Sequence, residues 1–146
     1  MKLTELLTSH LASEEGFRPY CYRDSLGYFT IGIGRLIDQR KGGGISREEA
    51  EYLLANDIDK VSKQLDSSLP WWRELSTTRQ VVIASMAFQM GVGTLLTFTS
   101  TLRFIRIGDY FSASEAMLDS RWAAQTPARA KRLAAAMRTN DSSNLG

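Results

Sequence analysis

The 146-residue sequence predicts an α+β fold in which a small β-hairpin lobe and a larger helical lobe are joined by a long helix. Aromatic and β-branched residues flank a turn between Phe17 and Ile37, a pattern typical of a hairpin. Apolar residues recur at helical spacing before this segment and again after Ser46. We therefore expect a cleft between the two lobes, because such interfaces are common ligand sites.

The first elements follow from local patterns. Leucines at 3, 6, 7 and 11 predict a short amphipathic helix that ends near Glu15, with Gly16 as its carboxyl cap. The hairpin turns around Asp24 to Gly27, and Lys41 with the next three glycines predicts a flexible connector. A polar segment, 139–146, is expected to fray at the end of the sequence.

The rest of the chain is predicted to be helical. Ser46 and Glu49 form a capping box that opens a helix of about twenty residues. The segment Arg79 to Met90 is almost entirely apolar, which predicts a helix buried on most sides, and three shorter helices are expected over 101–106, 110–120 and 127–138. We assign residues 13–60 to the β-containing lobe, and 1–12 with 61–146 to the helical lobe, within one domain spanning 1–146.

Composition excludes several classes of protein. Hydrophobic residues make up 43% and charged residues 23%, which is ordinary for a globular protein and argues against overall disorder. The net charge is +2, and residues 103–146 hold 7 Lys and Arg against 4 Asp and Glu, too small an excess for a dedicated nucleic-acid binder. We therefore expect no nucleic-acid partner.

The cysteine content and the hydropathy of the sequence indicate the cellular compartment in which the protein is made. The single Cys21 cannot form an internal disulfide, which is compatible with a reducing cytosol. No apolar run reaches the ~18 residues of a membrane span, and the first residues lack the apolar segment of a signal peptide. The sequence predicts a protein made in the cytosol without a signal peptide.

The segment EEGFRPYCYRDSLGYFTIGIG, from Glu14 to Gly34, carries the candidate chemistry. Glycosidic cleavage needs one protonated carboxyl group to donate to the leaving oxygen and one ionised group to act on water. Partial burial at a helix end beneath the hairpin would keep Glu15 protonated, whereas Asp24 in a turn would stay ionised. Glu14 is expected to be a solvated surface acid, and Asp24 is also a common turn residue.

Other interpretations of this segment are weaker. Gly32 and Gly34 have no third glycine at the spacing of a phosphate loop and no parallel βαβ unit around them, which argues against nucleotide binding. His10, the only histidine, has no cluster of ligands at metal spacing. We therefore expect neither a metal nor a cofactor.

The order Glu15, Asp24 and Thr30 within this segment resembles the catalytic signature of the T-even-type phage lysozymes, glycoside hydrolase family 24. The resemblance continues through nearly the whole chain in the same order. It includes FTIGIG, the helix residues from Glu49 to Asp59, MAFQMG, FTSTLR and SRWAAQTPARAKR.

The resemblance implies a lysozyme-like fold and a muramidase. Such an enzyme hydrolyses the β-1,4 bond between N-acetylmuramic acid and N-acetylglucosamine in peptidoglycan, with inversion. By position, Glu15 would be the general acid, Asp24 would activate or position the attacking water, and Thr30 would help to hold it. An inverting mechanism leads us to expect roughly 6.5 to 9.5 Å between the Glu15 and Asp24 carboxyl groups.

Further positions match the cleft of the family. The resemblance implies substrate contacts by Leu36, Phe88, Gln89 and Thr101, and pairing of Arg129 with the catalytic Glu15. We expect Trp122 to pack near Gln89 as part of the core and of the cleft wall, and Trp71 and Trp72 are further candidates for stacking against sugars.

Two departures from the family pattern stand out. Arg35 occupies the usual histidine position, and we expect it to pair with Asp57, the matching acidic position. The segment 35–44 is shorter than in the T-even relatives, and this shortening bears on the outer subsites.

The resemblance also implies a biological setting. A phage endolysin would accumulate in the host cytoplasm as a monomer and reach the periplasm and the peptidoglycan glycan strand after a holin-type pore opens the membrane. The alternatives left open are a lysozyme-like module that holds glycan without cleaving it, and a transglycosylase that forms an anhydro product.

Overall fold

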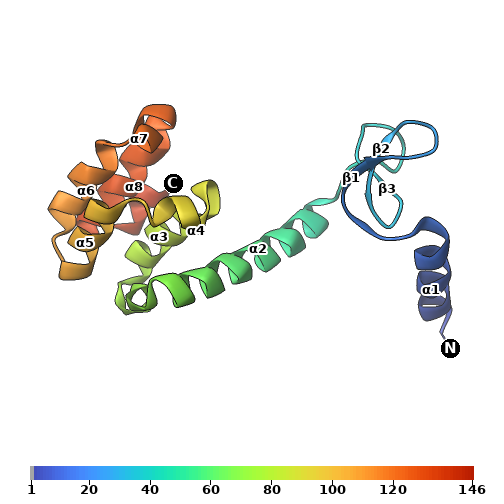
Figure 1. Cartoon of the computed structure of the whole chain (residues 1–146), viewed down its shortest axis with the longest axis horizontal. Helices are drawn as coiled ribbons and strands as arrows, with labels where there is room; N and C mark the ends of the chain where they lie inside the picture. The colour runs from blue at the N-terminus through green and yellow to red at the C-terminus, as the bar shows by residue number, and fades with distance from the viewer. Residues whose placement is uncertain (1) are drawn as a thin grey trace. The chain divides into compact units, whose positions relative to one another are not determined.

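The computed structural model describes residues 2–146 and divides the chain into two compact units, Met1–Leu53 and Leu54–Gly146. Figure 1 labels the helices and strands of both units. The helix-rich chain contains a small antiparallel sheet, so the predicted α+β class is confirmed. The assignment of residues 1–12 to a lobe shared with 61–146 remains a prediction.

The N-terminal unit begins with α1 (Leu3–Glu15), as predicted. Gly16 ends the helix with a φ of 70°, and its N–H donates to the carbonyl oxygen of Ala12 at 3.0 Å. A residue with a side chain rarely adopts this backbone conformation, which explains the glycine. None of the residues in α1 is buried, so its leucine stripe is exposed.

The predicted hairpin forms and gains a third strand. The antiparallel sheet has the order β1 (Arg18–Arg23), β2 (Phe29–Gly32) and β3 (Arg35–Leu36). β2 is the central strand, with Thr30 opposite Tyr22 on β1 and opposite Leu36 on β3. Cys21 lies exposed on the outer strand β1.

The glycine run after β3, which was expected to be a flexible connector, forms a hydrogen-bonded turn. The Gly43 N–H donates to the Arg40 carbonyl at 2.7 Å, and the Gly44 N–H donates to the Leu36 carbonyl at 2.8 Å. A Cβ at position 43 would collide with the Asp38 carbonyl oxygen, so the chain passes closely enough here to require glycine.

The long helix α2 (Arg47–Ser68) opens with the predicted capping box. The Ser46 N–H donates to a Glu49 carboxylate oxygen at 2.9 Å, and the Glu49 N–H donates to Ser46 Oγ at 3.1 Å. These bonds satisfy backbone donors that a helix start leaves unpaired. α2 contributes residues to both units, because the division falls between Leu53 and Leu54.

The C-terminal unit consists of short helices. They are α3 (Thr77–Met90), α4 (Val92–Leu95), α5 (Thr99–Ile107), α6 (Tyr110–Leu118), α7 (Arg121–Gln125) and α8 (Pro127–Thr139), with 3-10 turns at Pro70–Glu74 and Ser142–Leu145. The sequence patterns predicted α3, α5, α6 and α8 but did not separate α4 and α7. The last turn packs against α8, so the expectation of a frayed end is wrong.

The core of this unit surrounds α8, which packs against α3, α6 and α7. Its fully buried side chains include Leu65, Ile83, Met86, Met117 and Met137. α3 is buried on one side only: Val82, Ile83, Met86 and Ala87 face the core, while Val81 and Phe88 are exposed. The expected burial of α3 on most sides is therefore only partly met.

Within residues 2–146, no helix is both long enough and apolar enough to cross a membrane.

Candidate active site

The first candidate, Glu15, is the last residue of α1. Its carboxylate lies beside Gly34, the residue that precedes β3: a Cβ at Gly34 would be 2.7 Å from Glu15 Oε2. Glu15 is exposed, so the expected partial burial is not found in the N-terminal unit.

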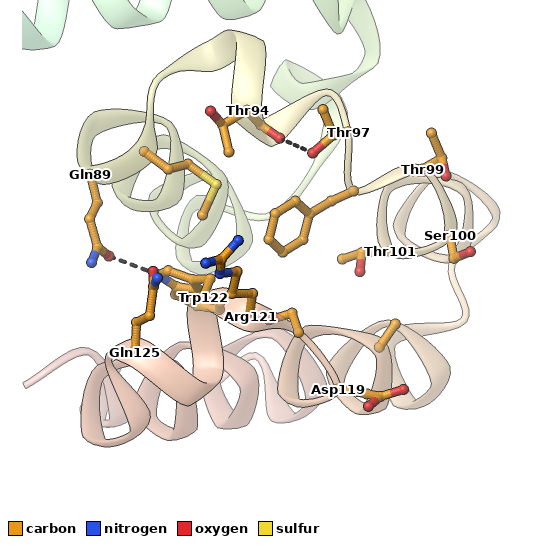
Figure 2. A pocket seen from close by; sticks show the side chains of 14 residues that line it. Gln89, Thr94, Thr97, Thr99, Ser100, Thr101, Asp119, Arg121, Trp122 and Gln125 are labelled. Carbon is orange, nitrogen blue, oxygen red and sulfur yellow. Dashed lines mark hydrogen bonds between the residues drawn. The ribbon is translucent and has the colours of Figure 1, made fainter.

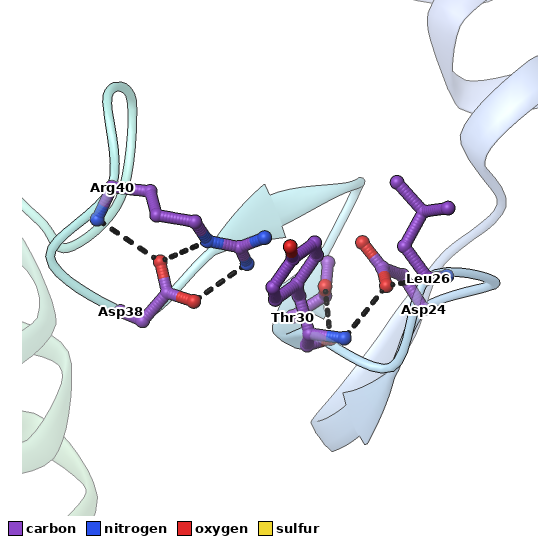
Figure 3. Close-up of polar contacts among 6 residues, drawn as sticks. Asp24, Leu26, Thr30, Asp38 and Arg40 are labelled. Atoms are coloured by element: carbon purple, nitrogen blue, oxygen red, sulfur yellow. Dashed lines mark hydrogen bonds and ion pairs between the residues drawn. The ribbon is translucent and has the colours of Figure 1, made fainter.

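Asp24 organises the turn between β1 and β2. Its Oδ1 accepts the backbone N–H groups of Leu26 at 2.9 Å and of Tyr28 at 2.8 Å, as Figure 3 shows. This is the turn role that aspartate performs well. The other carboxylate oxygen, Oδ2, takes part in neither of these bonds, so the same residue can both hold the turn and act on a ligand.

Thr30 lies at the centre of the sheet and is only 3% exposed. Its hydroxyl donates to the Tyr28 carbonyl oxygen at 3.0 Å. Tyr28 therefore uses its two peptide groups to hold the two candidates, the N–H for Asp24 and the carbonyl for Thr30 (Figure 3). Leu36 joins them from β3, directly opposite Thr30.

Arg35 forms an ion pair with Glu49, and its expected pairing with Asp57, which belongs to the other unit, stays a prediction. Its Nη2 lies 2.6 Å from Glu49 Oε2, in the first turn of α2. Glu49 is the acid that also closes the capping box, and the bonds with Ser46, followed by Arg35, hold the pKa of its carboxyl below the ordinary value. The capping box holds Glu49 in the first turn of α2, within reach of Arg35.

The C-terminal unit contains a pocket of about 680 Å³, which Figure 2 shows from close by. Three of the sequence candidates line it: Gln89, Thr101 and Trp122. Trp122 is 7% exposed and donates its indole N–H to Gln89 Oε1 at 2.9 Å, which confirms the expected packing of these two residues. The pocket volume lies within the range of small-molecule sites.

The lining of this pocket is rich in neutral hydrogen-bonding groups. Phe98 packs edge-on against Trp122, with ring centroids 6.4 Å apart. Arg121 and Asp119 are the charged residues of the lining, and hydroxyl groups come from Thr94, Thr97, Thr99, Ser100, Thr101 and Ser120. Aromatic faces together with many hydroxyl and amide groups suit a polar ligand such as a sugar.

Two other candidates of this unit lie apart from the pocket lining. Phe88 is 46% exposed at the end of α3. Arg129 donates through Nη2 to Ser85 Oγ at 2.9 Å, which ties α8 to α3. The pairing of Arg129 with Glu15 stays a prediction, as does the separation between the Glu15 and Asp24 carboxyl groups.

Sequence reasoning missed three residues that shape this site: Tyr28, Gly34 and Arg40. Tyr28 acts through its backbone, which leaves no signal in its identity. Gly34 could have been found from the closely spaced glycines of FTIGIG. Both Gly32 and Gly34 have a φ of 69°, a backbone conformation that favours glycine. Arg40 reaches the hairpin only because the turn after β3 folds back, as Figure 3 shows.

In the described part of the chain, no group of three or more His, Cys, Asp and Glu residues is placed to hold a metal ion.

Comparison with known proteins defines the class. The phage lysozyme family model matches residues 12–139, so the chain belongs to the phage lysozyme family. The small antiparallel sheet and the helical unit fit the lysozyme-like α+β fold. Membership identifies the chain as a hydrolase of the lysozyme class, the enzymes that act on peptidoglycan.

The individual relatives differ in how much of their own length matches this chain. The pre-baseplate central spike protein Gp5 of Enterobacteria phage T4 is 32% identical over 93% of this chain, and the match covers 28% of that protein. Probable T4-type lysozyme 1 of Dictyostelium discoideum is 30% identical, over 88% of this chain and 91% of its own length. Peptidoglycan hydrolase gp36 of Pseudomonas phage phiKMV is 32% identical, over 83% of this chain and 14% of its own length.

The chain thus spans less than a third of the two phage relatives and nearly all of the Dictyostelium relative.

Proposed function

We propose that this protein is an endolysin that hydrolyses the β-1,4 bond between N-acetylmuramic acid and N-acetylglucosamine in peptidoglycan. The observation that carries the proposal is the arrangement around Tyr28, whose N–H holds Asp24 and whose carbonyl holds Thr30. Beside the same sheet, the Glu15 carboxylate lies against Gly34. Two carboxyl groups and a hydroxyl group thus gather around one small sheet.

In the proposed reaction, Glu15 donates a proton to the glycosidic oxygen as the bond to the anomeric carbon breaks. Water attacks that carbon from the opposite face, held by Asp24 and Thr30, and its proton passes to the Asp24 carboxylate. Inversion requires room for this water, so the two carboxyl groups are expected to be roughly 6.5 to 9.5 Å apart in the working enzyme.

The remaining candidates are assigned to the glycan strand. Leu36, next to Thr30 in the sheet, and Phe88, Gln89 and Thr101 are proposed as substrate contacts. Trp122 supports Gln89 through their hydrogen bond. Arg129 is proposed to pair with Glu15 and to favour its ionised form after proton transfer.

The deciding experiment compares Glu15→Gln with Glu14→Gln in clearing of chloroform-treated Gram-negative cells. Loss of a general acid lowers the rate by about 10²-fold or more, so Glu15→Gln should abolish clearing. Glu14 is the exposed neighbour on α1, so Glu14→Gln controls for the loss of one negative charge at the same helix end. Clearing by Glu15→Gln at the wild-type rate would remove Glu15 from this role.

The outcome with the unmodified protein separates an enzyme from a binding module. A glycan-binding module would sediment with purified peptidoglycan but release no new reducing ends. Absence of both clearing and reducing ends in the wild type would contradict the enzymatic proposal.

Product analysis tests the mechanism. Hydrolysis yields reducing ends, whereas a transglycosylase yields anhydro ends that are lighter by one water, which mass spectrometry of the muropeptides distinguishes. Inversion predicts that the α-anomer appears first in proton NMR of freshly cleaved glycan. The β-anomer appearing first would contradict inversion.

Host lysis is the proposed biological role, with release from the cytoplasm to the periplasm through a holin-type pore and activity as a monomer. Expression in Escherichia coli should cause lysis only when a holin is co-expressed, while Glu15→Gln should not lyse in either case. Lysis without a holin would contradict the proposed route, and size-exclusion chromatography with light scattering tests the monomer.

A further inference from the structure

Arg40 lies over the ring of Tyr28, although the two residues belong to different parts of the sheet (Figure 3). Tyr28 precedes β2, and Arg40 belongs to the turn that follows β3. A guanidinium group over an aromatic face is attracted by the ring and also packs flat against it. Arg40 therefore contacts the one residue whose backbone holds both Asp24 and Thr30.

The guanidinium group is itself fixed by Asp38. Arg40 Nε donates to Asp38 Oδ1 at 2.9 Å, and Nη2 lies 2.6 Å from Oδ2. The Arg40 backbone N–H also donates to Asp38 Oδ1, at 3.1 Å. The two hydrogen bonds to Oδ1 and the ion pair with Oδ2 hold the guanidinium group beside Asp38.

The turn that carries Arg40 is held independently of this side chain. The Ile37 N–H donates to the Phe29 carbonyl at 3.0 Å, and the bonds of Gly43 and Gly44 close the turn on its other side. Because Gly43 cannot be replaced without a collision with the Asp38 carbonyl, the short connection fits this path closely. The backbone thus presents Arg40 and Asp38 to the hairpin even if one of their side chains is changed.

Electrostatics keep the contact charged at working pH. The hydrogen bond from Arg40 is the main cause that lowers the pKa of the Asp38 carboxyl, so Asp38 stays ionised through the neutral range. The same pairing raises the pKa of Arg40.

We propose that Arg40 is a positioning residue for the reaction, which fixes Tyr28 and through its peptide groups orients Asp24 and Thr30. This inference rests on the proposed function and extends it to a residue outside the catalytic signature. Arg40 touches neither water nor glycan in this role. It should therefore affect kcat, which depends on the orientation of the reacting groups, and leave KM nearly unchanged.

The test uses Arg40→Lys and Arg40→Ala in the full-length protein, with soluble glycan strands as substrate. Lysine keeps the charge but lacks the planar, two-point geometry, so Arg40→Lys isolates the orientation of the group from its charge. We expect Arg40→Ala to lower kcat about tenfold and Arg40→Lys to lower it by about threefold, with KM within twofold of wild type. A wild-type kcat in both variants would overturn the proposal.

The matched control is Arg47→Ala. Arg47 forms an ion pair with Glu51 at 2.9 Å in the same unit, but its side chain is 91% exposed. This variant should retain the wild-type kcat, and thermal unfolding of both variants measures how far each is destabilised. Equal losses of kcat in Arg47→Ala and Arg40→Ala would assign the effect to general destabilisation and overturn the positioning role.

A double-mutant cycle tests the contact itself. Tyr28→Leu removes the ring but keeps the backbone groups, so it should lower kcat as Arg40→Ala does. Because both changes remove one shared contact, the double variant should have the kcat of the slower single variant. Losses that multiply would show independent effects and overturn the inference.

These results are distinguishable from failure of the proposed function. If the wild type releases reducing ends and Glu15→Gln does not, the proposed glycosidase function is supported regardless of the kcat of the Arg40 variants. A wild type that releases no ends would overturn both proposals together.

Discussion

The Glu15 carboxylate occupies the space that a side chain at position 34 would need, and Gly34 leaves that space free. A Cβ at position 34 would lie 2.7 Å from Glu15 Oε2 and 2.9 Å from its carboxyl carbon, both closer than carbon atoms pack. Gly32, two residues earlier, has the same φ of 69° but meets no atom within 4 Å. The two glycines therefore share a backbone requirement and differ in their relation to the proposed acid.

Gly34→Ala should lower kcat by about tenfold or more, because the new methyl group must displace the Glu15 carboxylate. Gly32→Ala is the control: each substitution should cost about 1–2 kcal/mol of unfolding free energy from the positive φ, but only Gly34→Ala should impair cleavage. Urea denaturation and release of reducing ends measure the two quantities. Equal kcat values for the two variants would contradict the role of Gly34.

Trp122→Phe should destabilise the C-terminal unit by about 1–3 kcal/mol. The change removes the bond to Gln89 and leaves space beside Phe98 in a nearly closed part of the core. Trp122→Ala should cost about 3–5 kcal/mol. Trp71→Phe is the control, since Trp71 is only partly buried, and a larger loss in that variant would contradict this assignment.

Asp66→Asn should lower the melting temperature near neutral pH but not in acid. Hydrogen bonds from Arg73 and then from Trp72 lower the pKa of the Asp66 carboxyl, so the folded protein holds it ionised more readily than the unfolded chain does. The contribution of ionised Asp66 to the stability of the fold is fully present above the ordinary carboxyl pKa of about 4. It is lost as the pH falls through the lowered pKa of Asp66 in the folded protein.

The melting-temperature gap between wild type and Asp66→Asn should therefore close on acidification below about pH 4. Differential scanning calorimetry across the acid range checks this. A gap that widens in acid would contradict the sign.

Arg35 should be energetically coupled to Glu49, and a parallel cycle tests its expected pairing with Asp57. Double-mutant cycles of Arg35→Ala with Glu49→Gln and with Asp57→Asn measure both couplings from urea denaturation. The coupling with Glu49 should be small, because both side chains are 43% exposed, and it should weaken with added salt. A coupling only with Asp57 would contradict the observed pair.

Much of the fold follows from local chemistry that the sequence displays. The glycine cap of α1 and the Ser46–Glu49 capping box depend on residues close in sequence, and both are found where the patterns indicate. α4 and α7 span 4 and 5 residues, too short to show a helical period, so the pattern could not separate them. The two-residue strand β3 escaped for the same reason.

The site was harder to predict because it depends on contacts between residues that are distant in the sequence, which leave no local sequence pattern. The Trp122–Gln89 pair was expected because both residues lie in segments that match the family. The contact of Arg35 with Glu49 was not predicted, because it joins β3 to the first turn of α2 and no local pattern encodes it. The stacking of Arg40 on Tyr28 depends on how a turn folds back, which no local period encodes.

Cys21 provides a practical route to observing the hairpin at work. It is the only cysteine in the sequence, and it lies exposed on β1 beside Tyr22, which is paired with Thr30. A maleimide fluorophore will therefore attach at one known place without any added or deleted cysteine. The labelled protein would act as an optical sensor, whose emission reports in real time when a glycan strand settles against the sheet.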